Sequence, residues 1–221
     1  MIQIAHIETD FPTKFGVPRQ SGLVPTVGRV VFEPEYRNRE AVRGLDGFSH
    51  IWLLWIFSEA VRSDGAWSPT VRPPRLGGNR RMGVWATRSP FRPNNIGLSS
   101  VRILKIETDT PDGPAIWVEG ADLMNGTPIV DIKPYLPFSD SHPDARAGFA
   151  AQTYEHAPLK VVLPSSLSEV FSEKQLETLR KVLEADPRPH YQNDSERVYG
   201  MEYAGAEIRF RVDGDTLTVI E

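Results

Sequence analysis

Short hydrophobic stretches separated by turn residues dominate the first 135 positions of the chain. Rough alternation in the first ten residues predicts a strand, and similar patterns predict strands at 26–32, 82–87, 97–108, 115–121 and 128–132. Residues 48–57 are almost wholly apolar and too few for a typical helix, which indicates a buried strand. A short helix is expected at 34–42. Many strands with few helices favour a β-sandwich or a β-barrel.

The pattern changes after Lys133. Prolines punctuate a stretch from Pro134 to Pro158 that we interpret as a linker region. A helix is expected to begin near Ser172, because Ser172 and Gln175 have the spacing of a capping box. We expect this helix to end before Pro187.

Strands are expected after this helix at 197–203, 207–212 and 216–220, with a hairpin turn at 213–215. The chain is therefore expected to be mainly β. It is expected to divide into a first domain at 1–140, a linker at 141–159 and a small α+β domain at 160–221.

Composition limits the possible chemistry. The 221 residues include no cysteine, which excludes disulfides, thiolate metal sites and a cysteine nucleophile. The five histidines lack the spacing of metal ligands, so no metal is expected. No apolar run approaches the ~20 residues that span a bilayer. No signal-peptide pattern is visible either, so we expect a cytoplasmic protein without membrane contact.

Arginine is concentrated in one part of a chain whose net charge is −4. Residues 62–92 contain seven arginines and one acidic residue, and residues 62–83 are expected to form a long loop. Such a segment is either a local basic face that binds a polyanion or a solvated arginine-rich loop.

The stretch 83–100 is the richest in potential ligand-binding side chains. Arg88 and Arg92 carry guanidinium groups suited to phosphate or carboxylate. Asn94 and Asn95 offer donors and acceptors of the kind that contact base edges. The alternative is a proline-rich turn between strands.

A second candidate stretch covers residues 122–135. Asp131 and Lys133 are two positions apart, so on a strand both side chains point to one face. They form either an exposed ion pair or a general base with a neighbouring charge that tunes it.

Two further segments are less specific. The glycine-containing loop 17–23 could bring its backbone close to a ligand. At 186–191, Arg188 and Tyr191 could grip a phosphate and stack on a base, or the segment could be a rigid helix exit. The chain has no P-loop and no G-x-G-x-x-G pattern, so a nucleotide-like cofactor must be held in another way.

Taken together, these segments resemble the TrmO-like family (formerly TsaA-like proteins), the tRNA threonylcarbamoyladenosine methyltransferases. The matching stretches run in order along most of the chain: VPRQSGL (17–23), AVRGLDGFSHIWLLWIF (41–57), RPPRLGGNRRMGVWATRSPFRPNNIGLSSV (72–101), DLMNGTPIVDIKPYLPFSD (122–140) and DPRPHY (186–191).

The resemblance implies a compact β-barrel that binds S-adenosylmethionine, a homodimer, and a tRNA anticodon arm as substrate. The implied reaction methylates the 6-amino nitrogen of threonylcarbamoyladenosine beside the anticodon. The family's cofactor positions correspond to Gln20, Ser21, Gly22, Ser58, Glu59, Arg88, Ser100, Asp122, Leu123, Met124 and Asn125.

Catalytic and tRNA-binding roles are interpretations made beside this resemblance. Asp131 is the expected general base, with Lys133 and Tyr135 next to it. The residues expected to contact tRNA are Arg72, Arg75, Arg80, Arg81, Arg92, Asn94, Arg188 and Tyr191. Two other functions stay open, a non-catalytic module that binds RNA or a nucleotide and an enzyme that methylates a small molecule.

Overall fold

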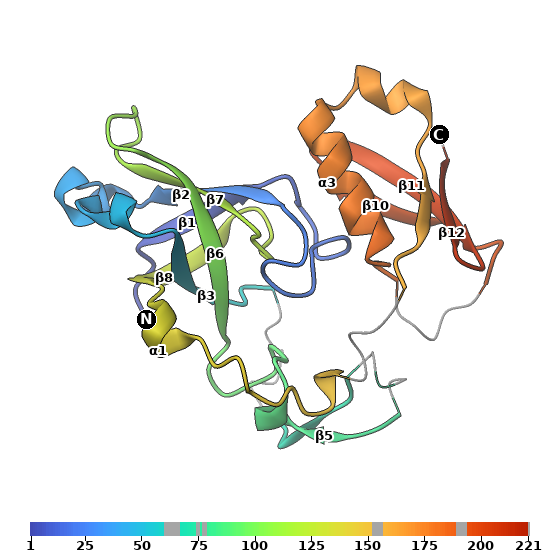
Figure 1. Cartoon of the computed structure of the whole chain (residues 1–221), viewed down its shortest axis with the longest axis horizontal. Coiled ribbons are helices and arrows are strands. Elements are labelled where there is room, and N and C mark those ends of the chain that lie inside the picture. The colour runs from blue at the N-terminus through green and yellow to red at the C-terminus, as the bar shows by residue number, and fades with distance from the viewer. Residues whose placement is uncertain (60–66, 74–75, 77–78, 152–156, 189–193, 221) are drawn as a thin grey trace.

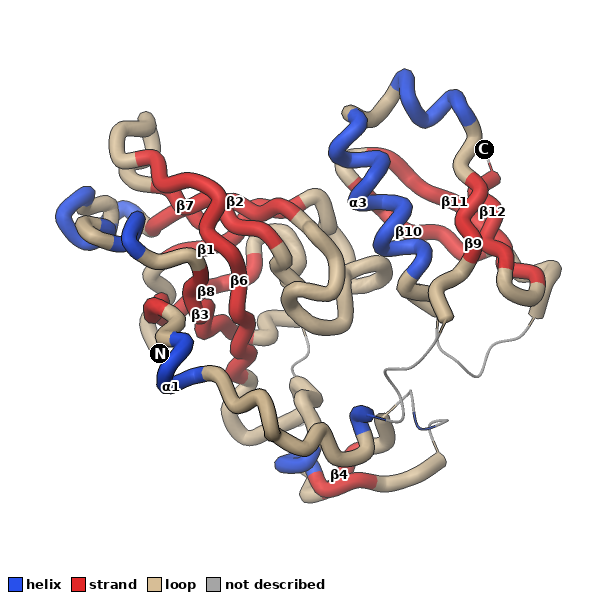
Figure 2. Tube along the Cα trace, in the orientation of Figure 1, coloured by secondary structure: helices blue, strands red, loops and turns tan. Residues whose placement is uncertain are grey.

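The computed structural model describes residues 1–59, 67–73, 76, 79–151, 157–188 and 194–220. Its described strands form a closed barrel, a separate four-stranded sheet and a two-stranded hairpin. Figure 1 shows the barrel and the four-stranded sheet as two bodies, with the hairpin in a lobe beside them. Figure 2 shows how few helices accompany these strands. The expectation of a mainly β protein is confirmed.

The barrel closes in the strand order β1-β2-β7-β6-β3-β8, and every pairing in it is antiparallel. A closed barrel leaves no unpaired strand edge. The sequence pattern left sandwich and barrel open, and the barrel is correct. The strands are β1 (Ala5–Thr9), β2 (Val27–Phe32), β3 (His50–Ile56), β6 (Ile96–Glu107), β7 (Ala115–Glu119) and β8 (Thr127–Pro134).

The apolar strand β3 is not buried on both faces. Ile51, Leu53 and Trp55 point into the barrel core, whereas the alternate residues are only partly buried. A strand of a barrel has one inner face, so the apolar residues between must lie outside. In place of a helix at 34–42, the β2–β3 connection holds three 3-10 turns: Pro34–Tyr36, Arg39–Val42 and Leu45–Gly47.

A small lobe follows β3. Within it, β4 (Thr70–Val71) pairs with β5 (Met82–Gly83), and a 3-10 turn covers Val84–Ala86. The expected strand at 82–87 is therefore wrong beyond Gly83. The buried side chain of Val84 anchors the turn, and the backbone N–H of Thr87 donates to the Val84 carbonyl. Part of the expected loop at 62–83 lies outside the described residues.

The C-terminal sheet has the order β10-β11-β12-β9. The α3 helix begins after a Ser172–Gln175 capping box, as expected, because both reciprocal hydrogen bonds are present. The expected hairpin is also confirmed, with Asp213 opposite Thr216. The elements are α1 (Pro137–Asp140), β9 (Lys160–Val162), a 3-10 turn (Ser165–Glu169), α3 (Glu173–Glu184), β10 (Tyr199–Tyr203), β11 (Ala206–Asp213) and β12 (Thr216–Ile220).

Two hydrophobic cores form, one in the barrel and one under the C-terminal sheet. The loop between β1 and β2 belongs to the second core, although it lies far away in sequence. Phe11 contacts Tyr203 with ring centroids 5.3 Å apart, and Phe15 stacks on Phe210 at 6.3 Å. Val24 is also buried there. The loop thus joins the two bodies, while the expected boundaries at 140 and 160 stay a prediction.

Candidate active-site cleft

A cleft of about 520 Å³ opens at one end of the barrel. Five segments meet there: the β1–β2 loop, the end of β3, residues 87–92, the start of β6 and the loop between β7 and β8. Aromatic and aliphatic side chains share its walls with polar ones, which is typical of a small-molecule site. The lining residues include Gln20, Trp55, Phe57, Ser58, Glu59, Arg88, Arg92, Leu98, Asp122, Leu123 and Met124.

The β1–β2 loop is tied to the opposite wall by Gln20. Its side-chain oxygen Oε1 accepts a hydrogen bond from Arg88 Nη1 at 2.5 Å. Its amide Nε2 donates to the Arg19 carbonyl at 2.5 Å, which fixes the side chain's orientation. Arg88 is itself exposed at the cleft. A guanidinium in this position is suited to a ligand carboxylate.

The floor of the cleft contains a chain of buried polar contacts. Trp55 Nε1 donates to Ser99 Oγ at 2.9 Å, and the Ser99 hydroxyl donates to Asp122 Oδ1 at 2.5 Å. Ser99 is fully buried, so both of its contacts lie inside the protein. This chain fixes the Asp122 carboxylate at the cleft surface.

Burial raises the pKa of Asp122 above that of an ordinary aspartate. Hydrogen bonding from Ser99, the charge of Arg88 and the backbone of Ser21 partly offset this effect. The Asp122 side chain therefore lies near Arg88, in surroundings whose burial disfavours its charged form. A ligand that brings hydroxyl or ammonium donors would satisfy it.

The β7–β8 loop is held against β1. Asn125 Oδ1 accepts from the Thr9 backbone N–H at 3.0 Å, and the Asn125 N–H donates to the Phe11 carbonyl at 2.8 Å. Thr9 Oγ1 donates to the Leu123 carbonyl at 3.2 Å. These bonds hold Leu123 and Met124 at the cleft wall without any contribution from a ligand.

Most of the residues expected at a cofactor site converge on this cleft. Gln20, Ser58, Glu59, Arg88, Asp122, Leu123 and Met124 line it. Ser21, Gly22 and Asn125 belong to the same loops but are not among the lining residues. Ser100 is on the outer face of β6, opposite Trp52 of β3. Their cofactor roles stay predictions.

Apolar wall residues were missed from the sequence. Trp55, Phe57 and Leu98 line the cleft, although they lie in stretches that read as strand core. Gly97 is a usable signal, because a Cβ there would overlap the indole of Trp55. A glycine inside a strand pattern indicates a close approach of this kind.

Asp131 and Lys133 lie on the outer face of β8, as their spacing predicts. Their side chains form an ion pair of 2.9 Å and are 43% and 62% exposed, respectively. Asp131 does not line the cleft; it is opposite Leu54, whose other cross-strand neighbour is the wall residue Leu98. Tyr135 packs on Trp52 with centroids 5.6 Å apart. The structure thus places the trio on the outer face of the barrel, two strands away from the wall residue Leu98.

The arginines expected to contact tRNA occupy different surroundings. Arg72, Arg80 and Arg81 are exposed in the β4–β5 lobe, and Asn94 is exposed next to it. Arg92 lines the cleft, with its guanidinium carbon 5.4 Å from the centroid of Trp85. Arg75 and Tyr191 lie outside the described residues.

Arg188 has an internal role. It is 8% exposed and forms a two-pronged ion pair with Asp186, with Nε–Oδ1 at 2.9 Å and Nη2–Oδ2 at 3.0 Å. Its guanidinium also lies over the ring of Tyr199. This arrangement matches the rigid helix exit that the sequence left as the alternative, and a tRNA contact of Arg188 stays a prediction.

Within the described ranges, no three or more histidine, aspartate or glutamate side chains are grouped as metal ligands. In the same part of the chain, no helix is long and apolar enough to cross a membrane.

Comparisons with known proteins identify the family of the chain. The family model described as the tRNA-methyltransferase O N-terminal domain matches residues 6–141, and that of the TrmO C-terminal domain matches residues 156–221. A protein of Escherichia coli named tRNA (adenine(37)-N6)-methyltransferase is 44% identical over 95% of this chain and 92% of its own. A protein of the same name from Eikenella corrodens is 48% identical over 75% of this chain and 92% of its own.

A solved structure extends the similarity to the whole fold. The crystal structure of TrmO from Pseudomonas aeruginosa superposes with a TM-score of 0.77 at 29% identity, over 99% of this chain and 96% of that one. The two family models together match most of the chain, and the two named relatives match it over 92% of their own length. The chain belongs to the TrmO family.

Proposed function

We propose that this protein transfers a methyl group from S-adenosylmethionine to the 6-amino nitrogen of adenosine 37 in tRNA, on threonylcarbamoyladenosine. The observation that carries the proposal is the cleft in which Arg88 and the fixed Asp122 carboxylate meet an apolar wall. Relatives named for methylation of adenine 37 support the choice of reaction.

The cleft residues fit S-adenosylmethionine by their chemistry. The volume of about 520 Å³ lies inside the usual range for ligand sites, roughly 300–1,000 Å³. Arg88 would bind the carboxylate of the methionine part, and Asp122 would accept hydrogen bonds from ammonium or ribose hydroxyl groups. Trp55 and Phe57 would pack against the apolar parts. When bound, the cofactor supplies an electrophilic methyl group.

The chain's own residues would contribute mainly by positioning. The attacking nitrogen of the proposed substrate is bonded to a carbonyl carbon, so its lone pair is delocalised and it is a weak nucleophile. Fixed walls such as the Gln20–Arg88 contact reduce the entropic cost of alignment, and effects of this type reach roughly 7–11 kcal/mol in favourable systems.

Proton removal from that nitrogen remains the role proposed for Asp131. The carboxylate is half exposed on the outer barrel face and held by Lys133 at 2.9 Å. A substrate base that reaches Asp131 from the cleft must cross the β3 residue Leu54, since Asp131, Leu54 and Leu98 are cross-strand neighbours. Lys133 would then be available to the substrate's threonine carboxylate.

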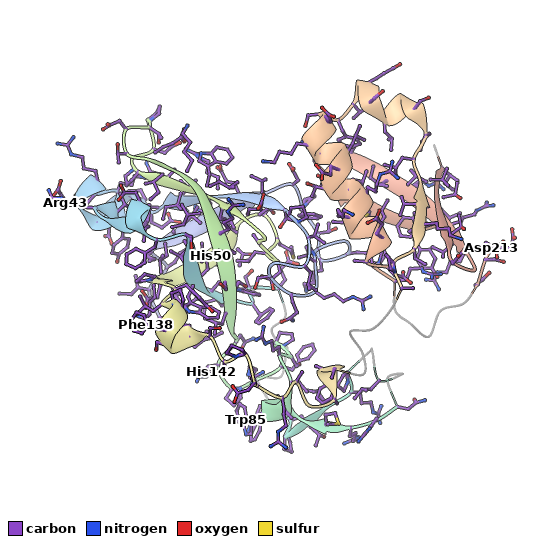
Figure 3. The ribbon with its side chains drawn as sticks, in the orientation of Figure 1. Arg43, His50, Trp85, Phe138, His142 and Asp213 are labelled. Atoms are coloured by element: carbon purple, nitrogen blue, oxygen red, sulfur yellow. The ribbon has the colours of Figure 1, made fainter. Side chains whose placement is uncertain are left out.

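The anticodon arm would be held by the β4–β5 lobe. Arg72, Arg80 and Arg81 are exposed there, and phosphate contacts by arginine supply affinity that weakens with salt. Replacing Arg80 with glutamine should lower tRNA affinity and reduce the log–log salt slope by about one unit. Arg43 is 76% exposed on another side of the molecule (Figure 3), so Arg43→Gln is the matched control.

A homodimer in the cytoplasm is the state we propose for the working enzyme. Leu98 and Phe138, which are 50% and 88% exposed, are apolar side chains that a second copy could cover. Light scattering of the purified protein measures its mass directly, and a monomer over the working concentration range would refute the dimer.

The first experiment is methylation of total tRNA by the purified protein with labelled S-adenosylmethionine, followed by mass spectrometry of the nucleosides. Methylated threonylcarbamoyladenosine would support the proposal. Label on another nucleoside would refute the substrate assignment. Cofactor binding without label on any RNA would favour the other two functions, a binding module or a small-molecule methyltransferase.

A further inference from the structure

Two of the five tryptophans are strongly exposed, and these two contact each other. Trp67 is 50% exposed and Trp85 is 66% exposed. Their ring centroids are 5.9 Å apart, with an angle of 29° between the ring planes. An isolated pair of large apolar rings held in water costs free energy unless a ligand covers it.

The pair lies beside the cleft. Trp85 belongs to the 3-10 turn Val84–Ala86, and Thr87, the next residue, lines the cleft. Arg92 also lines the cleft and lies over the Trp85 ring. Two hydrogen bonds from Arg92 Nη1, to the carbonyls of Thr87 at 2.8 Å and Ser89 at 3.1 Å, hold the guanidinium in place. Figure 3 shows Trp85 on the lobe, at the edge of the molecule.

The segment that carries the two tryptophans is rich in positive charge. Residues 67–95 contain six arginines and no aspartate, glutamate or lysine, in a chain whose net charge is −4. Exposed aromatic rings among arginines are the usual means of binding unpaired nucleotides, because each base stacks on a ring while arginines neutralise the phosphates.

We propose that Trp67 and Trp85 form a stacking platform for an unpaired nucleobase next to the target adenosine. The inference deepens the proposed function and rests on it. The platform would hold the neighbouring base while the target base enters the cleft that Arg92 borders. A second copy of this chain is the competing occupant; the excess of arginines would make contact between two such lobes repulsive.

The test uses the full-length protein and an anticodon stem-loop with its natural bases, compared with stem-loops in which either neighbour of the target adenosine is abasic. Trp85→Leu should weaken binding of the natural stem-loop about tenfold. Trp85→Phe should restore most of the loss, because it keeps an aromatic face. Phe48→Leu, which changes an exposed aromatic residue outside the lobe, is the control and should bind normally.

The decisive comparison is between variant and abasic RNA. Wild-type protein should lose about the same affinity when one neighbouring base is removed, and Trp85→Leu should lose nothing further on that RNA. If Trp85→Leu lowers the affinity for abasic RNA by the same factor as the affinity for natural RNA, the stacking platform is refuted. A change in oligomeric mass that accompanies the loss would assign the pair to contact between copies.

Two further readouts separate the possible failures. S-adenosylmethionine affinity should be unchanged in Trp85→Leu. If Trp85→Leu loses both cofactor binding and the circular-dichroism signal of helix and sheet, the variant is misfolded. Trp67→Leu then serves as the second variant for the same comparison. If wild-type protein methylates tRNA while both variants bind RNA normally, the stacking platform is refuted and the proposed function is kept. If wild-type protein does not bind RNA, the proposed function fails with it.

Discussion

Arg19 donates a hydrogen bond of 2.7 Å to the main-chain carbonyl oxygen of Asp186 and another of 2.8 Å to that of Arg188. The two ends of this contact are more than 160 residues apart in the chain. Arg19 precedes Gln20, which forms the bond to Arg88 across the cleft. The C-terminal domain thus holds the loop that forms one wall of the proposed cofactor site.

Replacing Arg19 with lysine should weaken this connection. Both hydrogen bonds come from Arg19 Nη2, and a lysine side chain keeps the charge but ends one bond short of that nitrogen. We expect weaker S-adenosylmethionine binding and a loss of about 1–2 kcal/mol in the free energy of unfolding. Calorimetric titration and urea denaturation measure the two quantities. Arg209→Lys, on the exposed face of β11, is the control. Normal cofactor affinity in Arg19→Lys would show that the loop is positioned without this contact.

Gly97 determines where Trp55 lies. The two residues are directly opposite each other on β6 and β3, and a Cβ at position 97 would overlap the indole. Gly97→Ala should therefore destabilise the fold by about 1–3 kcal/mol through overpacking. It should also displace the Trp55–Ser99 hydrogen bond and weaken cofactor binding. Gly126→Ala is unsuitable as a control because Gly126 has a positive φ, whereas Gly47→Ala meets open space. Equal stability of the Gly97 and Gly47 variants would contradict this account.

Protonation of Asp122 should weaken cofactor binding on acidification, and this acid limb of the affinity profile should begin at a higher pH than an ordinary aspartate would give. Burial raises its pKa, so on acidification the carboxylate takes up a proton at a higher pH than an ordinary aspartate does. If the charged form binds the ligand, affinity should fall as the pH drops through that raised pKa. Asp122→Asn should bind the cofactor more weakly at neutral pH and lack this limb. Measurements of cofactor affinity from neutral to acidic pH check it, and an acid limb retained in the variant would assign the titration to another group.

Removing the charge of Asp10 should make the fold more stable. Burial at the junction of the two bodies raises its pKa, and a hydrogen bond from Gln175 only partly opposes that effect. With the folded-state pKa above the unfolded value, the stabilising contribution is complete below about pH 4 and is lost as the pH rises through the folded pKa. Asp10→Asn should thus be more stable than wild type at pH 7.5 in urea denaturation.

The same comparison at low pH is the control for Asp10. Below about pH 4 both side chains are neutral, so the difference in unfolding free energy should vanish. Asp213→Asn, at an exposed position at the end of β11, should show no gain at either pH. A stabilisation that is the same at both pH values would point to packing rather than charge.

Asp131→Asn tests the proposed general base. The substitution keeps the size of the side chain and removes proton-accepting ability, so single-turnover methylation should fall by about 10²–10⁴. Cofactor and tRNA affinity should change little, because Asp131 does not line the cleft. Glu119→Gln, on the barrel strand β7, which does not pair with β8, controls for loss of a carboxylate. An unchanged single-turnover rate would remove Asp131 from this role.

Local sequence signals were accurate where local physics decides the structure. The Ser172–Gln175 capping box and the turn between Asp213 and Thr216 are formed within a few residues, and both are present as expected. The prediction failed at 84–87, because a buried Val84 and a 3-10 turn replace the expected strand. The apolar run of β3 also misled, since an outer barrel face can be apolar without being core.

The candidate site was only partly accessible from sequence. Gln20, Arg88 and Asp122 were expected together and do line one cleft. The roles of Trp55 and Leu98 in its wall were not, because an apolar strand residue gives no sign of whether it faces the core or a ligand. Arg188 was expected to contact tRNA, but its guanidinium forms an ion pair with Asp186, two residues away in the chain.

The sequence by itself determined the strand-rich character of the chain, the C-terminal helix with its cap, and the segments that identify the family. These depend on periodicity and on contacts between near neighbours. Only the tertiary structure decided that the β1–β2 loop packs into the second core, that Ser99 and Trp55 fix Asp122, and that Trp67 meets Trp85. Each of these joins residues from separate strands or loops, and the closure of the barrel and the packing of the two bodies set those distances.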